Sequence, residues 1–398
     1  MTVAAAPACE VLAGIEDLGL TPEGSVDASA EAAEAAGEGS AAGDATQEER
    51  AGDDASNPWD GGGGDGDAYS WGTDAADGGR EADAAGPVFG PPVAVVSGEN
   101  DPTGLTVTPG AIFWALKTRS VVRSAPRGTD GGASAAASDF ASFINPSPGA
   151  TDLVGDSTNL YALVGPLFNA NGCQTVQVTS SVTPGGMGFC EAISSSAVVR
   201  VAIDSANVYL SGSIIVGPSP APAIVYTAKP GIGVTPPGWS NFGSLASAPE
   251  AMASDGATLY YSLGSQIFGQ PTVSGSAFLF ARSSTSVTDL AVDGNQVYWI
   301  TAGGGVYAAS KTLPGDGGTA SPVPLASGQN GPMRLAQDSA NVYWTNQGDG
   351  SIAMAGKDGQ GSTQVAMDQA MPYGIAVDRL GVYWSNTGDG SIMMAPFR

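Results

Sequence analysis

The chain has 398 residues, of which 14 are basic and 39 acidic, so its formal net charge at pH 7 is −25. It contains no histidine, which excludes every histidine-dependent catalytic triad, proton shuttle and zinc site. Because this acidic balance repels phosphate backbones and anionic lipid heads, we expect neither a nucleic-acid partner nor binding to a membrane surface.

Residues 1–90 carry 20 of the acidic residues against Arg50 and Arg80, and consist mostly of Ala, Gly, Asp, Glu and Ser. Such a composition buries too little apolar surface to offset the entropy of ordering the backbone. We therefore predict a disordered acidic tether at 1–90, followed by one folded domain at 91–398. No apolar run approaches the ~18 residues that a transmembrane helix needs.

Cys9, which follows Ala6, Pro7 and Ala8, precedes this acidic stretch. The arrangement is typical of the mature end of a bacterial lipoprotein whose signal lies upstream, which makes Cys9 a candidate lipid anchor. The alternative is an ordinary N-terminus with a chance cysteine. Residues 1–10 themselves lack the basic start and apolar core of a secretory signal.

The other two cysteines, Cys173 and Cys190, enclose 16 residues in a glycine-rich region. With no CxxC motif and no histidine, a local disulfide fits them better than a metal site or catalysis. A disulfide would place the protein outside the cytosol, in the periplasm or at the cell surface. Two unpaired buried thiols are the alternative.

A short phrase recurs seven times between residues 91 and 398, and it predicts the architecture. In six copies an Asp stands five positions before a Tyr, and a seventh copy has Thr108 before Phe113. The six copies are Asp156/Tyr161, Asp204/Tyr209, Asp255/Tyr260, Asp293/Tyr298, Asp338/Tyr343 and Asp378/Tyr383. Each unit reads as four short strands joined by Gly- and Asp-rich turns, about 44 residues in all, which is typical of a propeller blade. The sequence therefore predicts an all-β, seven-bladed β-propeller of four-stranded antiparallel blades.

The last unit ends after three strands, and residues 92–98 supply an unassigned strand before the first unit. The sequence that leads from this strand into the first unit has the same register as the sequence that leads from residues 364–367, the fourth strand of the sixth unit, into the last unit. We predict that the N-terminal strand completes the last blade and closes the ring, which also protects exposed sheet edges.

The phrases Tyr343-Trp-Thr-Asn and Tyr383-Trp-Ser-Asn, each five residues after an Asp, resemble the YWTD-type propellers of lipoprotein receptors and their bacterial relatives. The resemblance covers about residues 91–398 and is clearest in units five to seven. The receptor propellers have six blades, whereas this chain has seven units. The resemblance implies the fold and a tendency toward binding roles, and it implies no catalytic residue.

The repeated Asp favours a structural role, because a short polar side chain at a strand–turn–strand junction caps the amides of the turn. Likewise, the Tyr and Trp positions indicate packing. The Gly-Asp-Gly turns at 348–350 and 388–390 lack the further acidic residues of a calcium loop and indicate tight hairpins.

Positions that differ between matching units are the candidates for function. Four residues before the repeated Asp, four units carry a charge, where the first strand of a blade begins at one mouth of the central channel. The candidate ligand-binding residues are Asp152, Arg200, Asp289 and Arg334, with Glu250 and Tyr373 beside them. Either these charged residues form ion pairs with one another or they bind a polar ligand.

We expect a monomeric, non-catalytic binding protein without a cofactor, metal or catalytic residue, whose ligand is a protein, a peptide or a glycan. The alternative is a metal-dependent propeller hydrolase of the lactonase type, with Asp152, Glu250 and Asp289 around one ion. Arg200 and Arg334 at equivalent positions would repel such a cation.

Overall fold

The computed structural model describes residues 86–119, 121–133, 135–142, 150–156, 159–164, 174–180, 186–191, 198–215, 220–229, 240–315 and 317–398, all within the compact unit Gly63–Arg398. Every regular element in these residues is a β-strand, and the strands form seven four-stranded antiparallel sheets. The predicted tether up to residue 85, Cys9 and the Cys173–Cys190 pairing lie outside the described residues and side chains. In the described part of the chain, no helix has the length and apolarity needed to cross a membrane.

Sheets 1 to 3 each use four consecutive strands. Sheet 1 comprises β2 (Pro102–Val107), β3 (Ala111–Leu116), β4 (Val121–Pro126) and β5 (Ser138–Ser142). Sheet 2 comprises β6 (Ala150–Gly155), β7 (Asn159–Val164), β8 (Gln174–Ser180) and β9 (Gly186–Glu191). Sheet 3 comprises β10 (Val198–Ile203), β11 (Asn207–Ile215), β12 (Pro220–Ala228) and β13 (Ser240–Ser244).

Sheets 4 to 6 repeat this order. Sheet 4 comprises β14 (Met252–Ser254), β15 (Thr258–Leu263), β16 (Gln266–Pro271) and β17 (Phe278–Arg282). Sheet 5 comprises β18 (Val287–Val292), β19 (Gln296–Thr301), β20 (Val306–Ser310) and β21 (Val323–Ala326). Sheet 6 comprises β22 (Pro332–Gln337), β23 (Asn341–Asn346), β24 (Ser351–Gly356) and β25 (Ser362–Ala366).

Sheet 7 joins the two ends of the described chain. It comprises β26 (Pro372–Asp378), β27 (Gly381–Asn386), β28 (Ser391–Pro396) and β1 (Val93–Val96). Strand β1 pairs antiparallel with β28, with Val93 opposite Met394 and Val96 opposite Ile392. The pairing confirms the predicted closure by the N-terminal strand.

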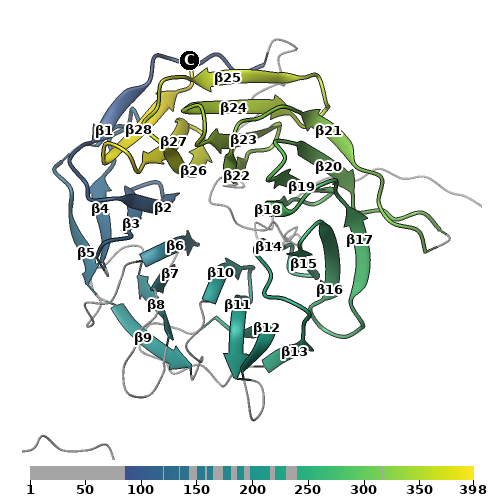
Figure 1. Cartoon of the computed structure of the whole chain (residues 1–398). Helices are drawn as coiled ribbons and strands as arrows, with labels where there is room; N and C mark the ends of the chain where they lie inside the picture. Colours follow the sequence, from purple (N-terminus) through teal and green to yellow (C-terminus); the bar gives the residue numbers. More distant parts are fainter. Residues whose placement is uncertain are drawn as a thin grey trace, which may run out of the picture. The chain divides into compact units, whose positions relative to one another are not determined.

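The first strand of each sheet contacts the first strand of the next, in the closed cycle β2, β6, β10, β14, β18, β22, β26 and back to β2. Figure 1 shows the seven sheets around a common centre, with these first strands innermost. The described architecture is consistent with a seven-bladed β-propeller.

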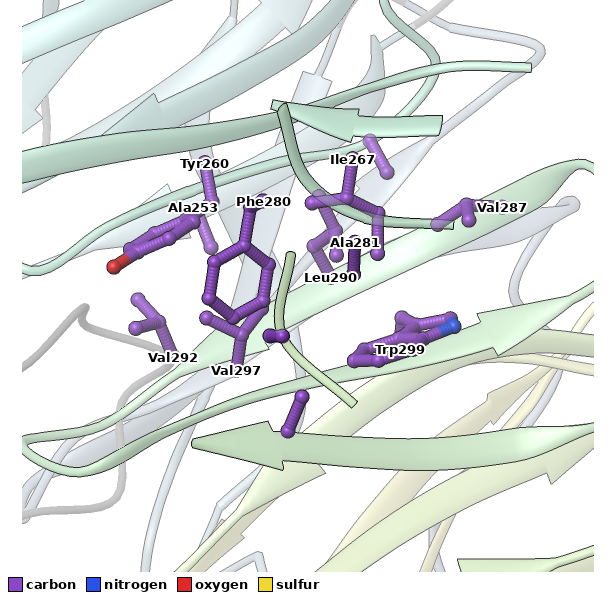
Figure 2. Close-up of a cluster of buried hydrophobic side chains, with 13 residues drawn as sticks. Ala253, Tyr260, Ile267, Phe280, Ala281, Val287, Leu290, Val292, Val297 and Trp299 are labelled. Carbon is purple, nitrogen blue, oxygen red and sulfur yellow. The ribbon is translucent and has the colours of Figure 1, made fainter. Parts of the chain in front are cut away.

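Apolar side chains fill the spaces between neighbouring sheets. In the cluster between sheets 4 and 5, Phe280 and Tyr260 meet edge to face with their ring centroids 5.1 Å apart, and Trp299 is fully buried (Figure 2). Aromatic side chains of this size bury the most apolar surface per residue, so such clusters supply much of the driving force for folding. The predicted packing role of the repeated Tyr and Trp positions is confirmed.

The repeated Asp caps the turn between the first two strands, as predicted. In sheet 6, Asp338 Oδ1 accepts from the backbone N–H groups of Ala340 and Asn341 at 2.8 and 2.7 Å, while Oδ2 accepts from the Tyr343 hydroxyl at 2.7 Å. Asp204 and Asp293 bind the amides of their own turns and the Tyr five residues on in the same way. The spacing of five residues between Asp and Tyr therefore serves one local hydrogen-bonded unit.

Four of these carboxylates also bind a cation from the next sheet. Each cation is the residue directly after the third strand of that sheet, so the ion pair ties two neighbouring sheets together. The pairs are Asp156–Lys229 at 2.6 Å, Asp255–Lys311 at 2.6 Å, Asp293–Lys357 at 2.7 Å and Asp378–Arg127. The last pair joins sheet 7 to sheet 1, where the Tyr383 hydroxyl also donates to the Gly131 carbonyl at 3.1 Å.

Candidate functional site

The seven innermost strands line a cavity of about 130 Å³ to which every sheet contributes. Apolar side chains such as Leu153, Met252 and Leu290 line part of it, and they follow directly on the positions that vary in charge between units. The cavity therefore combines an apolar wall with a charged layer where the strands begin. The charged layer consists of Asp152, Arg200, Asp289 and Arg334.

Six of the seven innermost strands have an irregular register near their first residues. In sheets 2, 3 and 5 the irregularity immediately precedes the charged residue, between Ala150 and Asp152, Val198 and Arg200, and Val287 and Asp289. A β-bulge changes the direction in which a side chain leaves a strand and is frequent beside functional sites. These three charged residues therefore directly follow an irregularity in the backbone at the start of their strands.

Arg334 crosses the charged layer from sheet 6 to sheet 2. Its Nη2 lies 3.6 Å from Asp152 Oδ1 and donates to the Tyr373 hydroxyl at 3.1 Å, while its guanidinium lies 4.9 Å from the centre of the Tyr373 ring. The intervening sheets 7 and 1 carry Gly374 and Gly104 at this register, so no side chain obstructs the crossing.

Arg200 crosses from sheet 3 to sheet 5 in the same manner. Its Nη2 donates to the Thr288 carbonyl at 3.2 Å, next to Asp289. The intervening sheet 4 carries only Ala251 at this register. Each arginine therefore reaches past a small residue toward a carboxylate on a sheet that is not its neighbour.

Both carboxylates bind backbone amides as well. Asp289 Oδ2 accepts from the N–H of Leu335 in sheet 6 at 2.8 Å, and Asp152 Oδ1 accepts from the N–H of Leu153 at 3.2 Å. Asp152 and Arg334 are each only 8% exposed as whole residues. The layer is a set of two negative and two positive groups, in which Asp152 and Arg334 are buried while Asp289 and Arg200 are half-buried.

The mutual influence of these charges appears in the directions of the pKa shifts of Asp289, Arg200 and Arg334. Burial raises the pKa of Asp289, against the opposing effect of Arg334 and Arg200. Burial and the like charge of Arg334 lower the pKa of Arg200. For Arg334, burial acts to lower the pKa, but Asp152, Tyr373 and Asp289 outweigh it and the pKa is raised. The four groups form one electrostatic unit.

The structure brings together four of the six candidate residues, Asp152, Arg200, Asp289 and Arg334, around one cavity. Tyr373 lies beside them through its contacts with Arg334. Glu250 is exposed and is not among the cavity-lining residues, because β14 begins only at Met252 and Glu250 lies in the loop before it.

Sequence reasoning missed the residues that hold the strand starts in place. Two residues after the repeated Tyr, a hydroxyl donates to a backbone carbonyl just before or within the first strand of the next sheet. These bonds run from Ser211 to Pro249 at 2.8 Å, from Thr345 to Tyr373 at 2.8 Å and from Ser385 to Thr103 at 2.7 Å. The recurrent Ser or Thr at this spacing was the signal that could have revealed them.

No cluster of three or more metal-ligating side chains occurs among the described residues. In the charged layer each carboxylate faces an arginine, which opposes a cation between the two carboxylates.

No known protein family matches the sequence, and no curated protein resembles it closely enough to be matched. Among solved structures, a streptogramin B lyase has a TM-score of 0.57 at 11% identity, over 77% of this chain and 97% of the lyase. The computationally designed protein Ika8 has a TM-score of 0.51 at 14% identity, over 77% of this chain and 99% of Ika8. At these identities the likeness concerns the fold alone, and it supports a β-propeller.

A nidogen in complex with laminin is also similar, at 13% identity with a TM-score of 0.44, over 62% of this chain and 88% of that chain. That score is too low to support an argument about this protein, so membership of the YWTD-type propellers remains a prediction from the sequence.

Proposed function

We propose that this chain is a non-catalytic binding protein with a seven-bladed β-propeller fold, and that it recognises a protein, peptide or glycan through the charged layer of its central cavity. One observation carries the proposal: four charged side chains from four different sheets, two of them buried and two half-buried, converge on one cavity. Burying charge is costly unless it is compensated, and folding alone does not require these residues at positions where sheets 1, 4 and 7 have Gly or Ala.

A glycan and peptide array, probed with the wild-type chain and with Arg200→Ala/Arg334→Ala, tests this function. We expect binding by the wild type and at least a ten-fold loss in the double variant, because both arginines face the cavity. Array hits that the double variant retains in full would place the binding site elsewhere and refute the proposal.

The alternative of a lactonase-type hydrolase needs a cation near Asp152 and Asp289, beside which Arg334 and Arg200 lie. Titration with calcium under calorimetry separates the two functions, since stoichiometric tight binding would favour the hydrolase. The likeness to a streptogramin B lyase does not extend to an activity at 11% identity.

We further propose that the protein acts outside the cytosol, since Cys173 and Cys190 are placed for a local disulfide in the sequence. Mass spectrometry of the unreduced protein is expected to show a deficit of about two daltons across these positions, one hydrogen lost from each thiol. Two free thiols in protein isolated from its own compartment would contradict this localisation.

A further inference from the structure

Resting on the proposed binding at the charged layer but going beyond the ligands proposed for it, we infer that the cavity also takes a small zwitterion, of the class of a free α-amino acid, with its carboxylate toward an arginine and its ammonium toward an aspartate. The inference follows from the order, the balance and the spacing of the four charges, and from the size of the cavity.

The order of the charges around the ring is regular. Sheet 2 presents Asp152 and sheet 3 presents Arg200, then sheet 4 has Ala251. Sheet 5 presents Asp289 and sheet 6 presents Arg334, and sheets 7 and 1 then have glycine. An acid followed by a base therefore occurs twice, separated by small residues, so any guest in the cavity meets both signs of charge.

This balance disfavours a guest with a single charge. An isolated anion gains from the two arginines but is repelled by the two carboxylates, and an isolated cation meets the reverse. A guest with one positive and one negative group interacts favourably with both sets, since opposite charges within about 4–6 Å stabilise each other. Its net charge of zero also leaves the cavity neutral.

The ion pair between Arg334 and Asp152 is not a direct hydrogen bond. Its 3.6 Å separation exceeds the roughly 2.7–2.9 Å of a charge-assisted hydrogen bond. A guanidinium has several N–H donors in a planar fork that matches a carboxylate. The carboxylate of the guest can therefore bind the N–H fork of Arg334. The ammonium group of the guest then binds Asp152 in place of the Arg334 guanidinium.

The volume of the cavity suits a small guest. A cavity of about 130 Å³ is well below the roughly 300–1,000 Å³ of pockets for drug-sized ligands. The apolar wall formed by Leu153, Met252 and Leu290 leaves space for a short aliphatic side chain on the guest.

Isothermal titration calorimetry of the full-length protein with each of the twenty common amino acids tests the inference. We expect at least one to bind, and its N-acetyl and methyl ester derivatives, each of which has lost one charge, to bind at least ten-fold more weakly. These measurements use the wild-type protein and do not depend on a variant that folds. Absence of binding by every amino acid, or equal affinity for the derivatives, overturns the inference.

The double variant Asp152→Asn/Arg334→Gln removes one acid and one base together and keeps the cavity neutral. We expect it to weaken amino-acid binding at least ten-fold. The matched control Asp368→Asn/Arg379→Gln makes the same two changes at exposed positions and should bind as the wild type does. Unchanged affinity in the cavity variant overturns the inference.

The outcome for the zwitterion is separable from that for the proposed function. Array hits that disappear in Arg200→Ala/Arg334→Ala, without binding of any amino acid, would keep the binding function and refute the zwitterion. Hits that are unaffected by both arginine changes would refute the binding function itself.

Discussion

The two ends of each innermost strand present carboxylates of two different kinds. At the far end, the repeated Asp caps a turn and in four sheets also binds a cation of the next sheet. At the near end, only sheets 2 and 5 have an Asp, and each lies in a layer with an arginine from a sheet that is not its neighbour. The carboxylate that six of the seven units repeat serves the fold, while one that most units lack is open to another purpose.

The comparison shows why a row of acidic residues is a poor indicator of a binding site in a repeat protein. Asp204, Asp255 and Asp293 already use their oxygens for turn amides, hydroxyls or ammonium groups. The departure from the repeat, not the repeat itself, points to the cavity.

Removing the closing strand should have the largest effect, because both strand ends depend on an intact ring. Replacing residues 91–98 by a Gly/Ser linker of equal length removes the pairing of β1 with β28 and its side chains Val95 and Val96 from the adjoining core. We expect a loss of about 4 kcal/mol or more in the free energy of unfolding and a clearly lower melting temperature. An unchanged calorimetric melting curve would contradict closure by this strand.

Asp204→Ala tests the turn end. Asp204 is 1% exposed and accepts from two backbone amides, the Tyr209 hydroxyl and the Ser254 hydroxyl. We expect a loss of about 3–4 kcal/mol in urea unfolding, because these donors are left buried without an acceptor. Ligand binding in the cavity should be unaffected in the folded fraction; if binding falls while stability holds, the division between the two ends is wrong.

Arg334→Met tests the opposite end. It leaves buried Asp152 without its paired cation and removes one of the two arginines that act on Asp289, and we expect a loss of about 2–3 kcal/mol. The double variant Asp152→Asn/Arg334→Met should recover part of this loss, because the unpaired negative charge has gone. A double-mutant cycle from urea unfolding measures the coupling, and strictly additive losses would show that the two groups do not interact.

Lys357→Met should have the smallest effect, about 1 kcal/mol at neutral pH, since the pair with Asp293 is only partly buried. Burial acts to raise the pKa of Asp293, but the hydrogen bonds from Lys357 and the Asn295 amide outweigh it, so the folded-state pKa is lowered. The pair therefore stabilises the fold above the unfolded-state pKa of about 4 and ceases to do so as the pH falls through the lower folded-state value.

The difference in urea stability between the wild type and Lys357→Met should accordingly shrink between about pH 5 and pH 2. A difference that stays constant over this range would show that the lost packing of Lys357 against the Tyr298 ring, 5.0 Å away, accounts for the effect.

Much of this fold was predictable from local pattern. The spacing from Asp338 to Tyr343 recurs because one hydrogen-bonded turn requires it, and a truncated last unit together with a spare strand predicted the closure. Interactions between residues far apart in the sequence were harder to predict. Lys357 pairs with Asp293 64 positions earlier, and no local rule relates the two.

For the candidate site, the register of the repeat identified four charged positions, but not how their side chains cross the cavity. That crossing depends on the bulges before Asp152 and Arg200 and on the small residue Ala251, whose effects appear only when the sheets are assembled. Glu250 was included because it adjoins Ala251 in the sequence. It lies in the loop before the strand, however, and its side chain is exposed outside the cavity.

Sheet 7 unites strands that are made at very different times during synthesis. Strand β1 ends at Val96 and its partner β28 begins at Ser391, so at roughly 5–20 residues per second a ribosome needs about 15–60 s to supply the partner. During this interval the apolar segment Val93–Val96 lacks its strand partner, and its unpaired backbone edge is open to other nascent chains. Production of this protein in the cell should therefore depend on chaperones that shield its amino-terminal strand until translation has passed the final repeat.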